Sequence, residues 1–129
     1  MPPSFEERVR TVVFVPTYNE AENLERLAGE VRRMLPDAEI LVVDDRSPDG
    51  TGEVADRLAV ADPRLHVLHR EPPKGRGVAG RDGYLEALRL GAEAVIEMDA
   101  DFSHDPALLP RFLEEIGKGA DLVLADTRG

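Results

Sequence analysis

The sequence predicts an α/β fold in which helices cover both faces of a mostly parallel β-sheet. Apolar, β-branched runs alternate with amphipathic stretches along the chain, and the segments that join them are short. Three of these apolar runs end in polar segments that contain carboxylates, at the strand ends where such sheets bind ligands. A chain of 129 residues can bury one sizeable core. We therefore expect a single domain over residues 1–129.

Two strand–helix pairs are expected in the first half of the chain. The apolar run at Thr11–Pro16 predicts a buried strand, and apolar residues at helical spacing predict a helix over residues 22–35. The run "EILVVDD" at residues 39–45 predicts the second strand. The next helix is expected over residues 51–60, where Thr51 is a suitable N-cap.

The alternation continues in the second half of the chain. Residues 64–70, "RLHVLHR", predict the third strand, and a loop rich in proline and glycine leads into a helix around residues 81–90. Two further strands are expected at residues 92–99 and 120–126, with a helix at residues 106–116 between them. Right-handed crossovers then leave few topologies for the sheet.

Composition and charge exclude several classes of function. A formal net charge of -10 argues against a broad phosphate-neutralising surface, and so against nucleic-acid binding. The absence of cysteine rules out disulfides, thiol catalysis and thiolate metal sites. The N-terminus lacks the apolar core of a signal peptide, and no apolar run approaches the roughly 20 residues of a membrane span. These features predict a soluble, cytoplasmic protein.

The segment "MDADFSHDP" ends the fourth predicted strand with two carboxylates, Asp99 and Asp101. Residues i and i+2 of a strand point to the same side, so these side chains would repel each other if the extended backbone continued through Ala100. A divalent cation would relieve the repulsion, because Mg²⁺ is usually held by one or two carboxylates and a substrate's phosphates. The alternative is a solvated loop in which Asp105 caps a helix that Pro106 begins.

The segment "GRGVAG" at Gly75–Gly80 has the glycine spacing of a dinucleotide-binding fingerprint, and Asp99 follows about 20 residues later. Its position argues against that function, because the fingerprint follows the first strand and this segment follows the third. The segment can instead form a flexible basic cover in which Lys74 and Arg76 are offered to phosphates. We therefore predict that it binds neither NAD nor NADP.

Two further polar segments follow the first and second strands. "DDRSPDGT" contains strong turn formers, but a turn does not explain the pair Asp44–Asp45 at the strand's end, where a carboxylate could accept hydrogen bonds from a ribose or a base. "PTYNE" places Tyr18 and Glu20 at the end of the first strand. Both residues also have a purely structural interpretation, in which Tyr18 is a half-buried aromatic and Glu20 lies in the first turn of a helix, where negative charge is favourable. A phospho-acceptor receiver domain is set aside, because its acidic pair belongs where "PTYNE" stands.

Taken together, "VPTYNEAENL", "VVDDRSPDGT" and "MDADFSHDP", in this order and each at a strand end, resemble the family-two inverting glycosyltransferases. Within these, the chain is most similar to the polyprenol-phosphate (dolichol-phosphate) mannosyltransferases, over about residues 11–124. The resemblance implies a GT-A fold and transfer of mannose, with inversion, from GDP-mannose to a polyprenyl phosphate. It also implies Mg²⁺ or Mn²⁺ as cofactor, and a lipid acceptor that would bring the protein to the cytoplasmic face of a membrane.

The resemblance also assigns roles to individual residues. Asp99 and Asp101 would form the catalytic DxD motif, which holds the metal against the diphosphate. Ser103 stands where some relatives have glutamine as a further metal neighbour, and Arg128 is a candidate for the family's arginine after the fifth strand. The resemblance assigns the nucleotide sugar to these two aspartates together with Pro16, Tyr18, Glu20, Val43, Asp45 and Ala100, and the basic segment described above adds Lys74.

Three functional hypotheses are compatible with these segments. The first is a mannosyltransferase that uses GDP-mannose, and the second is another family-two enzyme, such as one that transfers glucose from UDP-glucose to a polyprenyl phosphate. The third is a nucleotide-sugar-binding half domain without turnover, because the family's catalytic domain continues for about as long again. We accordingly expect residues 1–129 to bind the donor and to be incomplete at the C-terminus.

Overall fold

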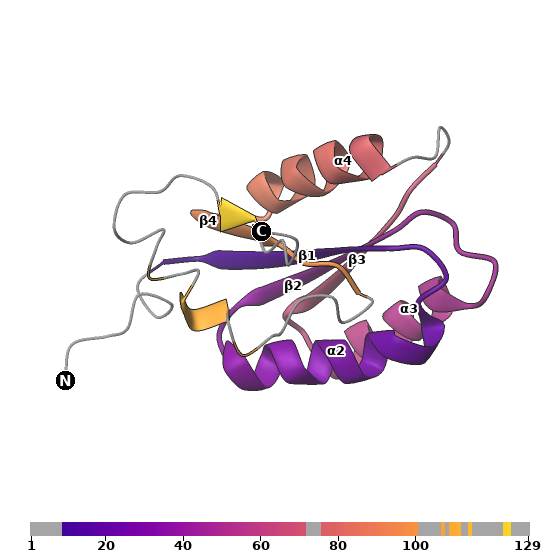
Figure 1. The fold of residues 1–129 in the computed structure, drawn as a ribbon, viewed down its shortest axis with the longest axis horizontal. Coiled ribbons are helices and arrows are strands. Elements are labelled where there is room, and N and C mark those ends of the chain that lie inside the picture. The colour runs from indigo at the N-terminus through magenta and orange to yellow at the C-terminus, as the bar shows by residue number, and fades with distance from the viewer. Residues whose placement is uncertain are drawn as a thin grey trace.

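In the computed structural model, strands and helices alternate from β1 to β4 as the sequence predicts (Figure 1), and most residues of the helix predicted at 106–116 lie outside the described part of the chain. The structure describes residues 9–71, 76–100, 107, 109–111, 114 and 123–124. Its strands are β1 (Thr11–Thr17), β2 (Glu39–Asp44), β3 (Leu65–His69), β4 (Ala94–Glu97) and β5 (Val123–Leu124). Its helices are α2 (Ala21–Met34), α3 (Thr51–Ala61) and α4 (Arg76–Arg89). Within the described ranges, no helix has both the length and the apolar character that crossing a bilayer requires.

All five strands form one parallel sheet in the order β3-β2-β1-β4-β5. The chain runs outward from β1 to β2 and β3 and then crosses back to β4, so the strand order reverses beside β1. Helices α2 and α3 cover one face of the sheet, and α4 covers the other (Figure 1). This arrangement confirms the predicted parallel sheet with helices on both faces. Ligands are expected at the carboxyl ends of β1 and β4, beside the reversal.

Alternate residues of each strand supply two separate halves of the core. On β1, Val13 and Val15 belong to the apolar cluster that includes α2 and α3, and Val12 and Phe14 belong to the cluster that includes α4. All four side chains are buried. The central strands are therefore uninterrupted apolar runs, because both faces of a parallel sheet are covered and successive side chains point to opposite faces.

Helix α4 begins at Arg76, well before the helix predicted around residues 81–90, and it takes in most of the glycine-rich segment. The prediction of a loop there was therefore wrong from Arg76 onward. Close packing explains a glycine in this helix: a Cβ on Gly83 would lie 2.7 Å from Cδ2 of Phe14 and 3.1 Å from Cγ2 of Val43. A glycine inside a helix lowers stability by about 0.5–1 kcal/mol relative to alanine, and close packing against the sheet outweighs this cost.

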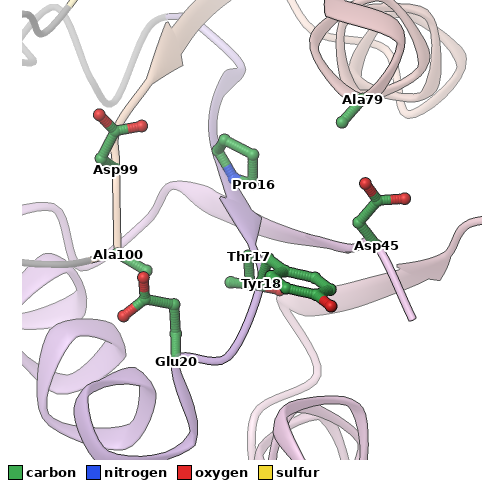
Figure 2. A pocket seen from close by; sticks show the side chains of 8 residues that line it. All are labelled: Pro16, Thr17, Tyr18, Glu20, Asp45, Ala79, Asp99 and Ala100. Atoms are coloured by element: carbon green, nitrogen blue, oxygen red, sulfur yellow. The ribbon is translucent and has the colours of Figure 1, made fainter. Parts of the chain in front are cut away.

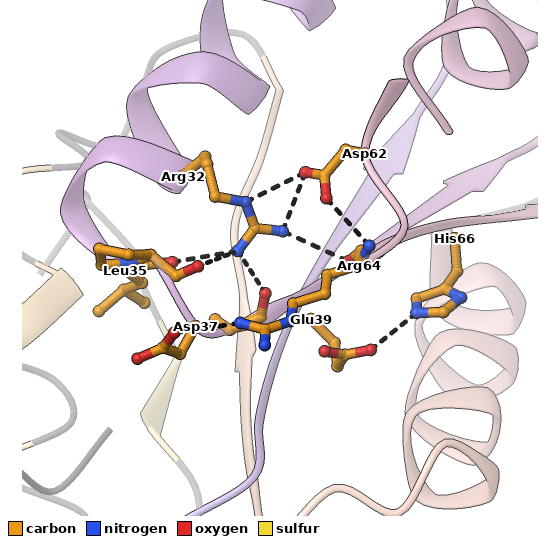
Figure 3. A network of polar contacts seen from close by, with 9 residues as sticks. Arg32, Leu35, Asp37, Glu39, Asp62, Arg64 and His66 are labelled. Atoms are coloured by element: carbon orange, nitrogen blue, oxygen red, sulfur yellow. Dashed lines mark hydrogen bonds and ion pairs between the residues drawn. The ribbon is translucent and has the colours of Figure 1, made fainter. Parts of the chain in front are cut away.

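Arg32 joins the end of α2 to the start of β3 at the amino-terminal end of the sheet (Figure 3). Its Nη1 donates to the carbonyl oxygens of Leu35 and Ala38 at 3.2 and 2.5 Å, and its Nη2 donates to that of Arg64 at 3.4 Å. Its Nε donates to Asp62 Oδ2 at 3.0 Å. The last carbonyl groups of a helix have no partner within the helix, so this network stabilises the fold where α2 ends.

Candidate active site

A cavity of about 420 Å³ opens at the carboxyl ends of β1 and β4, where the strand order reverses (Figure 2). The three polar segments that follow β1, β2 and β4 meet in this cavity, and α4 contributes one more residue. The cavity is lined by Pro16, Thr17, Tyr18, Glu20, Asp45, Ala79, Asp99 and Ala100.

The turn after β1, from residue 18 to the first residue of α2, is held in place by side chains from the loop that precedes α3 and from the first residue of that helix. The backbone N–H groups of the last three turn residues donate to Ser47 Oγ, Thr51 Oγ1 and Asp49 Oδ2 at 3.0, 2.9 and 3.1 Å. Backbone donors in such a turn would otherwise need water. The segment "DDRSPDGT" therefore fixes the backbone from which Tyr18, half-exposed, faces the cavity (Figure 2).

The two adjacent aspartates at the end of β2 have different roles in the structure. Asp44 is only 2% exposed, and its carboxylate accepts hydrogen bonds from Thr17 Oγ1 at 2.8 Å and from Ser47 Oγ and N–H at 2.6 and 3.1 Å. Asp45 lines the cavity. Of the pair, Asp45 alone thus lines this cavity, while Asp44 stabilises the loop.

Helix α3 starts after Gly50, whose φ of 92° lies in the left-handed region that glycine tolerates. The prediction that Thr51 caps this helix was wrong, because its hydroxyl accepts from the N–H of Glu20 and donates to the carboxylate of Asp49. That side-chain hydrogen bond is the main cause that holds the pKa of Asp49 below its ordinary value of 3.8. The backbone N–H groups of Ala21 and Thr51 act in the same direction.

Arg70 is a site residue that the sequence pattern did not single out. It directly follows β3, and its side chain is 1% exposed. Its Nη1 donates to Asp45 Oδ1 at 2.5 Å, and its Nε donates to Asp82 Oδ2 at 3.0 Å. The buried guanidinium therefore sits behind a carboxylate of the cavity wall. The available signal was a cation that ends an apolar strand in a strongly acidic chain.

The β4 side of the cavity is formed by Asp99 and Ala100 (Figure 2). β4 ends at Glu97, and Ala100 is buried and lies in a turn. The strand does not extend through Ala100, so strand geometry does not direct the side chain of Asp99 here, and Asp101 lies outside the described residues. Among the described residues, which leave out Asp101, no group of three or more acidic or histidine side chains is placed to hold a metal.

Of the other residues predicted for the site, the structure describes the side chain of Val43 alone. Val43 is fully buried in the core beneath α4, as strand alternation requires, so its side chain does not line the cavity. The side chain of Arg76 is outside what the structure describes. So are the whole residues Lys74, Asp101, Ser103 and Arg128.

The described lining of the cavity is acidic. Glu20, Asp45 and Asp99 contribute carboxylates, and the described lining residues include no lysine or arginine. Asp99 and Asp45 lie on opposite sides of Pro16 and Tyr18, which gives the cavity a β4 end and a β2 end (Figure 2). An anionic ligand such as a diphosphate would be repelled at the β4 end unless a cation bound beside it.

The chain is similar to proteins named as lipid-phosphate mannosyltransferases. It is 52% identical to the polyprenol monophosphomannose synthase of Mycolicibacterium smegmatis over 116 aligned residues, and these residues make up 89% of this chain and 44% of that protein. It is 47% identical to the undecaprenyl-phosphate mannosyltransferase of Micrococcus luteus over 120 aligned residues, and these residues make up 93% of this chain and 49% of that protein. The chain thus spans a little under half the length of these curated relatives.

Structural similarity leads to the same family. The mannosyltransferase PcManGT of Pyrobaculum calidifontis, solved in complex with GDP-Man and Mn²⁺, is 31% identical with a TM-score of 0.61, over 78% of this chain and 30% of that one. This likeness confirms the GT-A fold that the three segments implied. The profile of the family described as "Glycosyl transferase family 2" matches residues 12–129. This chain therefore belongs to family 2 of the glycosyl transferases.

Proposed function

We propose that the whole protein transfers mannose from GDP-mannose to a polyprenyl phosphate, with inversion and with a divalent metal. In this proposal the described cavity binds the donor. The observation that carries it is an acidic cavity at the strand reversal with carboxylates at both ends, Asp99 at one and Asp45 at the other. The names of the relatives support mannose and a lipid phosphate, and the ligands named for the similar solved structure support GDP-mannose and Mn²⁺.

The β2 end of the cavity would bind the nucleoside. The half-exposed ring of Tyr18 offers an apolar surface next to the carboxylate of Asp45 (Figure 2). A carboxylate accepts strong hydrogen bonds from ribose hydroxyls or from N–H groups of a base. Guanine presents two adjacent donors, N1–H and the N2 amino group, whereas uracil presents one donor between two carbonyl acceptors. This chemistry favours GDP over UDP.

The β4 end would bind the metal and the diphosphate. The oxygens of Asp99 are hard donors that suit Mg²⁺ or Mn²⁺, and we assign Asp99 and Asp101 as ligands, with Ser103 as their neighbour. When bound, the cation would neutralise the negative charge that develops on the leaving diphosphate. Lys74 is assigned to the phosphates because its charge precedes α4, which forms part of the cavity wall.

The acceptor phosphate needs no strong general base. Its second pKa is about 6, so it is already ionised near neutral pH. One of its oxygens would bond to C1 of mannose while the bond between C1 and the GDP oxygen breaks, and GDP would leave with that electron pair. A lipid acceptor implies that the protein works at the cytoplasmic face of a membrane.

Calorimetric titration tests the donor half of this proposal. With Mn²⁺, GDP should bind at least about tenfold more tightly than UDP, and at least about tenfold more tightly than it does in EDTA, each a difference of about 1.4 kcal/mol. Equal affinity for GDP in Mn²⁺ and in EDTA would contradict the metal site. Tighter binding of UDP would favour a uridine donor such as UDP-glucose.

Transfer of labelled mannose from GDP-mannose to a polyprenyl phosphate in detergent tests the reaction. We expect metal-dependent transfer by the full-length protein and donor binding without transfer by residues 1–129 alone. Donor binding without any transfer by the full-length protein would contradict the enzymatic proposal and favour a binding function.

A further inference from the structure

We propose that Asp82, on α4, is a positioning residue of the donor site. It holds the guanidinium of Arg70, and Arg70 in turn orients the carboxylate of Asp45 towards the nucleoside. This inference rests on the proposed function, because it takes the cavity to bind a nucleoside diphosphate. Neither the sequence pattern nor the resemblance assigned a role to Asp82 or Arg70.

The geometry of the three side chains supports a relay. Arg70 Nε donates to Asp82 Oδ2 at 3.0 Å, and Nη1 of the same guanidinium donates to Asp45 Oδ1 at 2.5 Å. The backbone of Arg70 is also tethered, because its N–H donates to the carbonyl of Asp44 at 2.9 Å. With a side chain only 1% exposed, Arg70 has no route to an alternative position in solvent. Its guanidinium thus has fixed partners at both ends.

The planarity of the guanidinium makes this relay directional. Nε and Nη1 belong to one rigid, planar group, so a hydrogen bond at Nε sets the plane in which Nη1 points. Without Asp82, the plane of Arg70 would lose its second anchor, and the carboxylate of Asp45 would lose its fixed orientation. A carboxylate that must accept hydrogen bonds in one geometry binds less tightly when it is free to rotate.

Charge gives a second reason. The guanidinium of Arg70 is shared by two carboxylates, so the cluster of Asp45, Arg70 and Asp82 carries one net negative charge. Removing the charge of Asp82 would leave Arg70 paired with Asp45 alone. That pairing would weaken Asp45 as an acceptor for the donor groups of a nucleoside, because its charge would be fully compensated. Orientation and charge therefore change binding in the same direction.

The position of Asp82 is itself fixed by the packing of α4. The next residue, Gly83, lies so close to the sheet that an added Cβ would be 2.7 Å from Phe14. One turn earlier, Ala79 of the same helix lines the cavity. Arg81 approaches the other carboxylate oxygen of Asp82, Oδ1, at 3.6 Å, but its side chain is 71% exposed. α4 therefore supplies both a wall of the cavity and the anchor of the relay.

The test is calorimetric titration of the protein with GDP in Mn²⁺. Asp82→Ala should weaken GDP binding about tenfold, and Asp82→Glu should recover part of the loss. The matched control is Glu86→Gln, which removes a carboxylate on the same helix that pairs with the exposed Arg89. The control should change the affinity by less than about twofold.

A double-mutant cycle separates positioning from general destabilisation. If Asp82 acts through Asp45, Asp82→Ala should change GDP affinity by less than about twofold once Asp45→Ala is present. Wild-type affinity for Asp82→Ala, or an equal loss in both backgrounds, would overturn the proposal. If Asp82→Ala does not fold in a thermal melt, Asp82→Asn takes its place in the same cycle. Failure of the wild-type protein to bind GDP in Mn²⁺ would overturn the proposed function, and this inference with it.

Discussion

The two ends of the sheet each contain an arginine that joins several segments, but the two arginines have different partners. Arg32, at the amino-terminal end, donates mainly to backbone carbonyls and to one carboxylate, and its side chain is 25% exposed (Figure 3). Arg70, at the carboxyl end, is buried and binds two carboxylates, one of which lines the cavity. Carbonyl groups need partners wherever a helix ends, whereas a carboxylate held at a cavity wall is available for a ligand's donors.

This comparison separates the two ends by what a substitution should change. Variants at the amino-terminal end should alter stability without altering nucleotide affinity. Variants at the carboxyl end that remove a charged side chain lining the cavity, or one that holds it, should alter affinity, with or without a change in stability. Measuring both quantities for each variant therefore tests whether the ends differ as the contacts imply.

Asp99→Asn is expected to have the largest effect on affinity. It removes a proposed metal ligand. Loss of a residue that only supports a metal ligand already lowers affinity by up to about 100-fold, so GDP affinity in Mn²⁺ should fall by at least about 100-fold. Stability should change little, because the variant removes one of the carboxylates that repel each other in the cavity. Asp37→Asn, at the amino-terminal end beside Arg64, is the matched control and should leave affinity unchanged. Calorimetric titration with GDP, in Mn²⁺ and in EDTA, measures the affinity of both variants. Unchanged affinity for Asp99→Asn would show that Asp99 is not a metal ligand.

Arg70→Met should lower both stability and affinity. It leaves Asp45 and Asp82 without their shared cation, which should lower the free energy of unfolding by about 3 kcal/mol. We expect the lower end of the range for a broken buried pair, because Asp82 is 34% exposed. GDP affinity should fall about tenfold, because the loss of the fixed orientation of Asp45 outweighs the gain from leaving its charge uncompensated. Urea denaturation and calorimetry measure the two effects, and a destabilised variant that binds GDP normally would show that Asp45 needs no support from Arg70.

Arg32→Met should lower stability alone. The lost hydrogen bonds leave carbonyl groups of Leu35 and Ala38 to be solvated at a partly exposed site, so we expect the free energy of unfolding to fall by about 1–2 kcal/mol. GDP affinity should stay within about twofold of the wild type, because the network lies at the other end of the sheet. A tenfold loss of GDP affinity by the folded variant would mean that the two ends are coupled.

The sheet could be predicted from the sequence because its signal is local. The unbroken apolar run at Thr11–Pro16 predicted β1 to within one residue, since burial on both faces depends on the composition of the strand itself. The site was less predictable where a role depends on distant partners. The resemblance singled out Asp45, but the local sequence of the pair Asp44–Asp45 does not indicate which carboxylate faces the cavity, because the answer depends on Thr17 and Arg70.

The helix that anchors the site was harder to predict for a different reason. Glycine disfavours helices in isolation, so the segment before residue 81 reads as a loop. The part of the helix that was missed is held by contact with the sheet, because Ala79 is buried in the cluster that includes Phe14 and Val43. The relay between Asp45, Arg70 and α4 depends on that contact, and no local pattern could reveal it.

Asp49→Asn is expected to have the smallest effect, and that effect depends on pH. The hydrogen bond from Thr51 is the main reason that the pKa of Asp49 lies below 3.8 in the folded chain. A carboxyl whose pKa is lower in the folded than in the unfolded state contributes stability above the unfolded pKa, and this contribution disappears as the pH falls through the folded pKa. The melting temperature of the wild type should therefore exceed that of Asp49→Asn slightly at about pH 6, and the difference should shrink below pH 3.8.

The variant Thr51→Ser provides the control for this pH dependence, because it keeps the hydroxyl that donates to Asp49. Adding Asp49→Asn to Thr51→Ser should lower the melting temperature with the same pH dependence as in the wild type. A difference between the wild type and Asp49→Asn that stays constant from about pH 6 down to about pH 3 would contradict the shifted pKa. Asp49 is at the carboxyl end but contacts the backbone of the turn after β1 and does not line the cavity. GDP affinity at neutral pH should change by less than about twofold, because asparagine keeps a side-chain oxygen that can accept from the N–H of Ala21 and so preserve the turn.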